Sequence, residues 1–312
     1  MELPILILAW KRPNHTKEVI QSLKDIKPKN IYLACDGPNP NNEKEINLVN
    51  KTRYILENEI NWPCKKLKLY SAKNQGCRLG VSKAINWFFE NVSEGIILED
   101  DCIAHPDFFK FSEILIDRFR DDKRIWSISG NNYQRGIWRG NGSYYFSKFP
   151  HCWGWATWKD RWTHYSEEEL IWQKIKNSNM TQNIFPKKEY KYWESIFEKL
   201  YKYNKPDSWA YRWFLVCQAY GGLSVLPNIN LVKNIGFDST ATHTNKGECP
   251  IKLKHKKTES TGLIPLKEPT FIIRSIDADN FTFINFYNAR FHIKIINKCK
   301  FLINKFKEIF RL

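Results

Sequence analysis

Three acidic residues, Glu99, Asp100 and Asp101, stand side by side at the end of an apolar run that predicts a buried strand. Adjacent carboxylates repel one another unless a cation compensates, and hard oxygen ligands suit Mg²⁺ or Mn²⁺ with phosphate oxygens completing the shell. In open α/β sheets, ligands bind at the carboxyl ends of strands. The triplet therefore predicts a metal and phosphate site. The alternative is an acidic turn that caps a helix beginning near Pro106.

Three further polar side chains are predicted at the same edge. Arg12 follows the first predicted strand and Asp36 the second, so both face this edge if the sheet is parallel. An arginine binds phosphate through its forked donors, and an aspartate accepts hydrogen bonds from a ribose or a base. The turn at 74–80 brings Arg78 toward the same place. Each residue also fits ordinary turn chemistry or, for 74–80, a simple loop with a helix N-cap.

The elements that must position these residues follow from hydrophobic patterning. Short β-branched runs alternate with amphipathic stretches, which predicts an α/β fold with a mostly parallel, Rossmann-like central sheet flanked by helices. We expect helices after Pro13, around 81–88 and twice between 187 and 221. The strands are expected at 3–10, 30–36, 66–70, 95–101 and 227–232. No Walker loop or G-x-G-x-x-G fingerprint is present, which argues against an ATPase or a dinucleotide enzyme.

Composition and charge limit the partners. The 312 residues are 42% hydrophobic and 15% aromatic, enough to fill a core, and the net charge is +16. Such a charge favours phosphates, nucleic acids or anionic membranes. Between Arg290 and Arg311 there are seven Lys/Arg against one Glu, and the apolar side chains lie along one helical stripe. This predicts a basic amphipathic C-terminal helix that binds an anionic membrane surface or packs on the body.

The cysteines and the first residues indicate the compartment. Eight cysteines contain no C-x-x-C pair, so we expect reduced thiols without a structural zinc. The opening residues form neither a secretory signal nor a membrane span. We therefore expect a cytoplasmic protein, peripheral at the inner face of the cytoplasmic membrane if the basic tail binds there.

Four blocks in order resemble the bacterial GT-A glycosyltransferases related to N-acetylglucosaminyltransferase I, some of which are labelled hemolysin-like. The blocks are LILAWKRP (6–13), ILEDDC (97–102) with PDFF (106–109), CWGWATW (152–158), and PNINLVKNIGF (227–237) with ATHT (241–244). The resemblance implies a GT-A-like domain over 1–245, with a nucleotide-sugar half (1–140) and an acceptor half (141–245). Residues 246–312 would be a linker, most clearly at 246–269, and the basic tail.

The resemblance also implies a role for each matching residue. Asp101 would hold Mn²⁺ or Mg²⁺ on the diphosphate of a nucleotide sugar, Asp100 would contact the ribose or sugar, and Glu99 the transferred sugar. The remaining contacts that it implies are Arg12 and Asp36 to the nucleotide, Thr242 and His243 in a loop closing over the diphosphate, and Trp153 and Trp155 to the acceptor. The alternative for the two tryptophans is burial in the core. Arg78 is expected to bind the nucleotide sugar because the turn at 74–80 brings it to the same edge.

The catalytic base is the least defined position. The family's aspartate falls on Asp207, Ser208 or Ala210 depending on the alignment, and only Asp207 can accept a proton. Asp207 is therefore the predicted base. The alternative is that Asp207 is the N-cap of a helix at 209–220, with Ser208 as a competitor for that position.

The expected function is an inverting, metal-dependent hexosyl- or N-acetylhexosaminyltransferase. It would use a UDP-sugar and a glycan or lipid-linked acceptor in bacterial surface polysaccharide synthesis. One alternative is a sugar nucleotidyltransferase, but 9–13 lacks the glycine-rich phosphate loop of that class. Another alternative is a basic nucleic-acid-binding protein. Two observations argue against it: much of the excess charge lies in the tail, and no RNA-binding aromatic motif is present.

Overall fold

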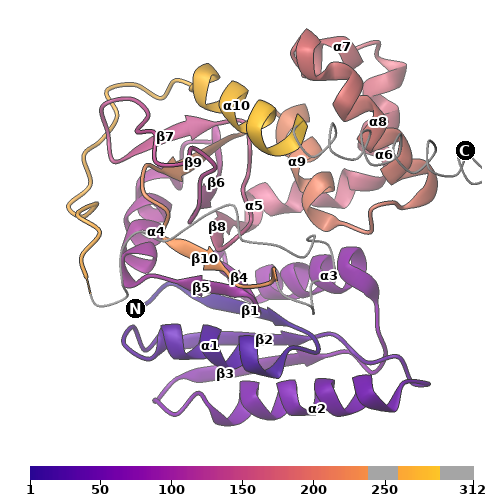
Figure 1. Cartoon of the computed structure of the whole chain (residues 1–312), viewed down its shortest axis with the longest axis vertical. Coiled ribbons are helices and arrows are strands. Elements are labelled where there is room, and N and C mark those ends of the chain that lie inside the picture. Colours follow the sequence, from indigo (N-terminus) through magenta and orange to yellow (C-terminus); the bar gives the residue numbers. More distant parts are fainter. Residues whose placement is uncertain (238–258, 289–312) are drawn as a thin grey trace, which may run out of the picture.

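A computed structural model describes residues 1–237 and 259–288 (Figure 1). In this part of the chain, eight strands form one sheet in the order β3-β2-β1-β4-β8-β6-β9-β7. Only β8 and β7 run antiparallel to their neighbours. The predicted α/β fold with a mostly parallel sheet is confirmed. The bounds are β1 (Ile5–Ala9), β2 (Asn30–Cys35), β3 (Lys65–Tyr70), β4 (Glu94–Glu99), β6 (Ile125–Ser129), β7 (Tyr144–Ser147), β8 (Trp155–Trp158) and β9 (Leu223–Pro227).

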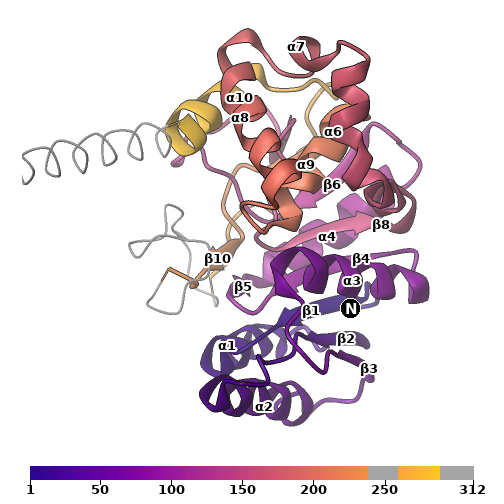
Figure 2. The ribbon, with the colours of Figure 1, turned by 90° about the vertical axis from the view of Figure 1, so that its right-hand side faces the viewer.

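Helices cover both faces of the sheet because both faces are apolar. Along β1, Ile5 and Ile7 join the core under α1 (Pro13–Leu23), α2 (Glu43–Asn58) and α4 (Pro106–Phe119). The alternate residues Leu6 and Leu8 join the core under the opposite helices. These are α3 (Gly76–Asn91), α6 (Glu168–Asn177), α8 (Lys187–Tyr203) and α9 (Trp209–Ala219). Figure 2 shows α6 to α9 gathered at the end of the molecule opposite α1 and α2.

Short elements complete the two layers. A helical turn, α5 (Lys159–Trp162), leads into the 3-10 turn η1 (Thr163–Glu167), and α7 (Thr181–Ile184) joins α6 to α8. A second, two-stranded sheet pairs β5 (Cys102–Ala104) with β10 (Val232–Asn234) in antiparallel fashion. This small sheet ties the segment after β4 to the segment after β9.

The predicted strand at 227–232 is wrong. The structure places β9 before it and β10 after it, and residues 228–231 form the connection. Asn228 donates its side-chain amide to the carbonyls of Arg139 and Gly142, and Asn230 accepts from the backbone N–H of Asn132. Such side-chain bonds to the backbone compete with strand pairing, and period-2 patterning does not reveal them.

Residues 259–288 pack on the body. Thr261 donates to Asp107 of α4, and the Ser143 N–H donates to the carbonyl of Lys267. Helix α10 (Ile276–Thr282) continues into a π-helical turn, η2 (Phe283–Asn288), and its Asp279 accepts from Ser147 of β7. The expected linker at 246–269 is therefore integrated into the body from residue 259 onward. Thr242, His243, the rest of the expected linker and the basic tail lie outside the described residues.

Two further findings concern the membrane and the cysteines. Within 1–237 and 259–288, no helix combines the length and apolar character needed to cross a bilayer. The cysteines in these ranges are free thiols.

Candidate functional site

The carboxyl ends of β1 and β4 carry the centre of the candidate site. Arg12 donates from Nη1 to Asp101 Oδ2 at 2.8 Å and to Asp100 Oδ1 at 3.3 Å. The backbone N–H of Trp10 donates to Asp100 Oδ2 at 3.1 Å. All three charged side chains are largely buried, between 9% and 13% exposed. The structure thus joins three of the predicted residues directly.

This location is the point where the strand order reverses. From β1 the sheet grows through β2 to β3 in one direction, and β4 then pairs with the other side of β1. Helix α1 after β1 and helix α3 before β4 cover opposite faces. Open α/β sheets bind ligands at such a switch point, in the crevice outside the carboxyl ends of the strands. Arg12 and the acidic triplet lie at this switch point.

The far side of Asp101 is held by the small sheet. Asn234 at the end of β10 donates its side-chain amide to Asp101 Oδ1 at 3.0 Å, and Ile235 N–H donates to the Asp101 carbonyl. A Cβ on Gly236 would stand 2.1 Å from Asp101 Oδ2. Glycine at position 236 is therefore what lets the chain pass so close to the carboxylate.

Mutual repulsion and burial perturb the acids. Removal from water and the charges of Asp101 and Asp100 raise the pKa of Glu99 to about 8. The same causes, with Asp101 as the charged neighbour, raise the pKa of Asp100 to about 6. One guanidinium thus compensates the triplet only in part, and an additional cation would favour its fully ionised form.

The donor chemistry of this edge fits a divalent metal. In the described ranges, no three or more His, Cys, Asp or Glu side chains are grouped so that they could hold a metal ion by themselves. Mg²⁺ and similar hard cations commonly take only one or two carboxylates and complete the shell with water and phosphate oxygens. Asp101, with Asp100 beside it, supplies oxygen ligands of this kind.

The alternative role for the triplet, capping the next helix, is not what the structure shows. Helix α4 begins at Pro106, and its N-cap is His105, whose Nδ1 accepts from the N–H of Asp107 at 3.1 Å. Asp100 and Asp101 instead bind Arg12, and Asp101 also binds Asn234.

Asp36 and Asp207 both accept backbone hydrogen bonds at the N-terminus of α3. Asp36 accepts from the backbone N–H groups of Gln75 and Gly37. Asp207 accepts from Cys77 N–H at 2.8 Å through Oδ2 and from Arg78 N–H at 3.2 Å through Oδ1. A carboxylate at a helix N-terminus satisfies free N–H groups and complements the helix dipole.

Cys77 is near members of both groups of acids. Burial raises the pKa of its thiol to about 12, and the charges of Glu99, Asp207 and Asp36 contribute in that order. Cys77 at the start of α3 is thus close enough to the end of β4 and to the two aspartates for their charges to act on its thiol. All the predicted acids gather at one edge of the sheet.

Asp207 does not cap its own helix. The N-cap of α9 is Ser208, which makes no side-chain capping bond. Asp207 instead bridges the start of α9 to the start of α3, which lies some 130 positions earlier. As the predicted base, Asp207 would have to share oxygens that already accept two backbone hydrogen bonds.

The side chain of Arg78 points to a different partner. Its Nη1 donates to Glu168 Oε1 at 2.9 Å and to Glu169 Oε1 at 3.1 Å, both on α6. Glu168 also pairs with the buried Arg212. A role for Arg78 in binding a nucleotide sugar would therefore have to compete with two carboxylates.

The two predicted acceptor tryptophans differ. Trp155 on β8 is 1% exposed and stacks on Trp209 with ring centroids 5.5 Å apart, so it is a core residue that an acceptor cannot reach. The prediction for Trp155 is corrected on this ground. Trp153 is half-buried and makes edge-on contacts with Tyr133 and with Phe237, the residue after Gly236. Trp153 thus lies beside the segment that holds Asp101.

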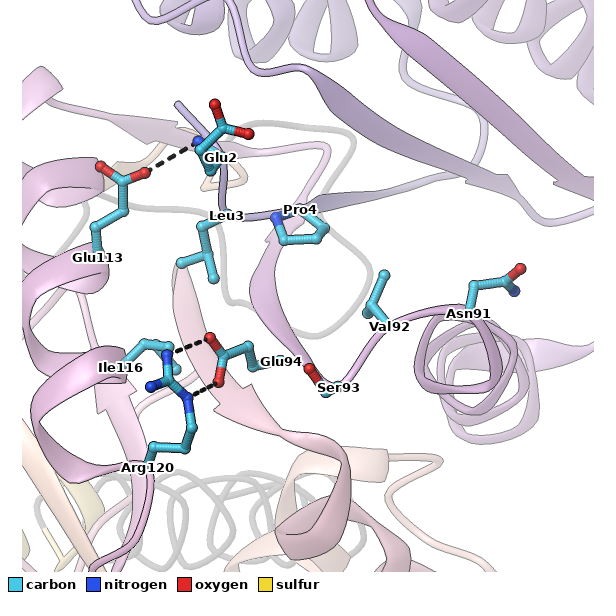
Figure 3. A pocket seen from close by; sticks show the side chains of 10 residues that line it. All are labelled: Glu2, Leu3, Pro4, Asn91, Val92, Ser93, Glu94, Glu113, Ile116 and Arg120. Atoms are coloured by element: carbon cyan, nitrogen blue, oxygen red, sulfur yellow. Dashed lines mark hydrogen bonds and ion pairs between the residues drawn. The ribbon is translucent and has the colours of Figure 1, made fainter.

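A cavity of about 550 Å³ lies at the opposite edge, next to the amino ends of β1 and β4 (Figure 3). Leu3, Pro4 and Ser93 line it, and Glu94 there pairs with Arg120. None of the predicted site residues lines this cavity. It is therefore separate from the candidate site.

Sequence reasoning missed the residues that hold the acids in place. Asn234 and Gly236 lie in a block that resembles the glycosyltransferase family, but their contacts with Asp101 depend on the pairing of β10 with β5. Cys77 carries no local signal for a position between three carboxylates. Only the tertiary arrangement reveals these residues.

Several solved structures are distant matches to this chain. No protein-family model matches the chain, and no curated protein sequence matches it. A UDP-glucose pyrophosphorylase solved with UDP-glucose is 12% identical with a TM-score of 0.33, and the match covers 54% of this chain and 80% of the other.

Two further solved structures also match. The mannosyltransferase PcManGT from Pyrobaculum calidifontis, solved with GDP-Man and Mn²⁺, is 10% identical with a TM-score of 0.31 over 51% of this chain and 46% of the other. An active-site mutant of LgtC is 6% identical with a TM-score of 0.32 over 77% of this chain and 91% of the other. Likeness at this level does not assign a function.

Proposed function

We propose that this protein is a metal-dependent glycosyltransferase that uses a nucleotide sugar. The observation that carries the proposal is the contact of Arg12 with Asp100 and Asp101 at the switch point of the sheet. A guanidinium fork and a set of carboxylates at that crevice can bind a diphosphate together with a divalent cation. The resemblance of four sequence blocks to bacterial GT-A enzymes supports the same class.

The chemistry that these residues offer concerns the leaving group. Negative charge grows on the diphosphate as the glycosidic bond breaks, and fixed donors at that point lower the barrier. Arg12 provides such donors, and Trp10 N–H fixes Asp100 in place. A Mn²⁺ or Mg²⁺ held by Asp101 would add electrostatic stabilisation of the leaving diphosphate. In this proposal Glu99 and Asp100 contact the sugar and the ribose, and Asp36 the nucleotide.

Asp207 is the proposed base. The acceptor hydroxyl must lose its proton as it attacks the anomeric carbon, and a carboxylate within reach can take it. Asp207 accepts from Cys77 N–H at the start of α3, and the charge of Glu99 also acts on the Cys77 thiol. Attack from the face opposite the leaving diphosphate would invert the configuration at the anomeric carbon.

The donor and acceptor follow from the resemblance. We propose a UDP-sugar as donor and a glycan or lipid-linked acceptor in surface polysaccharide synthesis, with Trp153 on the acceptor side. The nucleotide-sugar half (1–140) and the acceptor half (141–245), with Thr242 and His243 closing over the diphosphate, remain part of this proposal. So does peripheral association with the inner membrane face through the basic tail.

The test is a thermal-shift screen of UDP-, GDP-, CMP- and dTDP-sugars with and without Mn²⁺. One nucleotide class should raise the unfolding midpoint only with the metal, because a ligand that binds the folded state stabilises it. Asp101→Asn should lose this shift, whereas Asp117→Asn, an exposed aspartate on α4, should keep it. If no sugar nucleotide raises the midpoint under any metal condition, the proposal fails.

The products separate the two enzyme classes. With donor and a mixed acceptor extract, a glycosyltransferase releases the nucleoside diphosphate. A nucleotidyltransferase instead consumes the sugar nucleotide only when pyrophosphate is added, and yields a nucleoside triphosphate and a sugar 1-phosphate. Turnover that depends on pyrophosphate would replace the proposed activity with the second one.

A further inference from the structure

Exposed apolar side chains are concentrated around α10. Thirteen large hydrophobic side chains in the described ranges are exposed, and six of them lie in two short stretches. One stretch is the connection from β6 to β7, and the other is the segment at 270–284 that contains α10. We call these six residues the α10 patch: Ile137, Trp138, Phe271, Ile273, Ile276 and Ile284.

The two stretches lie side by side. Asn141 Nδ2 donates to Thr270 Oγ1 at 2.8 Å, and Gln134 Nε2 donates to the Ala278 carbonyl at 3.0 Å. The guanidinium of Arg139 lies over the ring of Phe281, 5.4 Å from its centroid. Figure 1 shows the connection into β7 running next to the segment that leads into α10. The six side chains therefore belong to one region of the surface.

The inner side of α10 is already used by the fold. Ala278, Asp279 and Thr282 are buried, and Asp279 bonds Ser147 and Arg274. Ile276, the first residue of α10, and Ile284, in the turn η2 that follows, are 63% and 57% exposed. Both therefore stand at the surface of a segment whose other side packs on the body.

The aromatic members stand out from the surface. Trp138 is 52% exposed and Phe271 is 69% exposed, each on an irregular segment beside α10. Tryptophan and phenylalanine on the apolar side of a surface with cations nearby are typical of proteins that lie in the membrane interface. Two exposed cations, Arg135 and Lys267, precede the two stretches in the sequence, and the exposed Asp277 follows Ile276.

The charge of the sequence that follows the α10 patch indicates what kind of partner binds this patch. The sequence that continues from η2 carries seven Lys/Arg and one Glu between Arg290 and Arg311. A polybasic sequence that follows a segment with exposed apolar side chains matches an anionic lipid surface, where each Lys or Arg near the surface contributes about 1 kcal/mol. A single weak anchor binds reversibly, and two together hold a protein at the membrane.

We propose that the α10 patch inserts into the interface of an anionic membrane and acts with the basic tail to hold the protein there. The apolar side chains enter the boundary between headgroups and acyl chains, and the cations contact the lipid phosphates. This inference rests on the patch itself and is independent of the donor and metal chemistry.

The experiment is co-sedimentation of the full chain with vesicles of phosphatidylcholine plus phosphatidylglycerol, and with phosphatidylcholine alone. Wild-type protein should bind the anionic vesicles more strongly. The double variant Trp138→Ser, Phe271→Ser should lower the partition coefficient on anionic vesicles about tenfold or more, because it removes buried apolar area. Its unfolding midpoint should stay at the wild-type value, since both side chains are exposed.

The matched control is Tyr54→Ser, Tyr203→Ser, which removes two aromatics that are 69% and 59% exposed on α2 and α8, away from the patch. This variant should bind like wild type. Raised salt should weaken the vesicle binding of every protein but leave the ratio of the partition coefficients of the two double variants unchanged. Equal binding by the two double variants overturns the proposal. A second result would also overturn it: a dimer in sedimentation velocity that forms with the wild-type protein and is lost only in the patch variant. The patch would then be an interface between two copies.

Discussion

Asp207 forms a bond pattern that supports two different roles. Its oxygens accept from Cys77 N–H and Arg78 N–H at the start of α3. The charge of Glu99 also acts on the Cys77 thiol. Asparagine keeps an oxygen for Cys77 N–H but cannot take a proton. We expect Asp207→Asn to lower kcat at least about 100-fold with little change in donor binding or unfolding midpoint.

Comparing Asp207→Ala with Asp207→Asn separates the two roles of this residue. Asp207→Ala removes both the proposed base and the cap, so it should lower the free energy of unfolding by about 1–2 kcal/mol in addition to the loss of turnover. Urea unfolding and steady-state kinetics measure the two effects. Wild-type turnover by Asp207→Asn would show that the residue only positions α3 against α9.

Glu99 provides a pH dependence of stability. Its pKa is raised to about 8 in the folded protein, against about 4.3 in an unfolded chain, so the folded state holds a proton that the unfolded state has lost. Its contribution to stability is present at acidic pH and is lost as the pH rises toward 8. In a chelating buffer, Glu99→Gln should therefore gain stability relative to wild type as the pH rises from about 5 to about 9.

Unfolding midpoints across this pH range test the prediction. Glu90→Gln, an exposed change on α3, is the control and should show a constant difference from wild type. A constant difference for Glu99→Gln as well would mean that its carboxylate is compensated in the folded state.

At the scale of elements, Arg161 binds carbonyl groups at and just after the C-terminal end of α4. Its buried guanidinium donates to the carbonyls of Phe119, Arg120, Asp122 and Ile125 and lies 4.3 Å from the centre of the Trp158 ring. We expect Arg161→Met to lower the free energy of unfolding by about 2–4 kcal/mol, because it leaves buried carbonyls without donors. Arg124→Met, which removes an exposed pair with Asp122, should cost less than about 1 kcal/mol. Equal losses in urea unfolding would contradict this assignment.

The sequence allowed prediction of the elements whose pattern is local. The strands that became β1 to β4 and the helices α3, α8 and α9 were predicted near their observed positions because burial on one or both faces sets their periodicity. The failed strand at 227–232 depends on side-chain bonds of Asn228 and Asn230 to distant backbone. Periodicity carries no information about such bonds.

The site was predictable to the same extent. Arg12 and Asp101 could be placed at one edge because parallel strands carry their carboxyl ends to the same side. The burial of Trp155 and the partner of Arg78 were not predictable, since they depend on α9 and α6, which are packed from other parts of the chain. The bridging role of Asp207 likewise joins positions that are far apart in sequence.

At the scale of the whole molecule, the segment 259–288 belongs to the folded body. It supplies partners to Asp107 through Thr261, to Ser143 through Lys267 and to Ser147 through Asp279. A chain ending at residue 288 keeps these contacts and serves as the reference. A chain ending at residue 245 should unfold at a markedly lower midpoint or aggregate, because buried polar groups lose their partners.

Calorimetry of the two truncated chains measures this difference. A chain ending at residue 245 with the wild-type midpoint would show that the segment at 259–288 adds nothing to stability.

The insertion of β8 between β4 and β6 has a consequence during synthesis. Strand β4 bonds β1 on one side and β8 on the other, although β8 begins 56 positions after β4 ends (Trp155 against Glu99). On the ribosome, the first four strands emerge and pair while one edge of β4 stays open. Such an edge pairs readily with other chains until it is covered. A nascent chain must therefore be synthesised through Trp158 before this edge of β4 can be covered by β8.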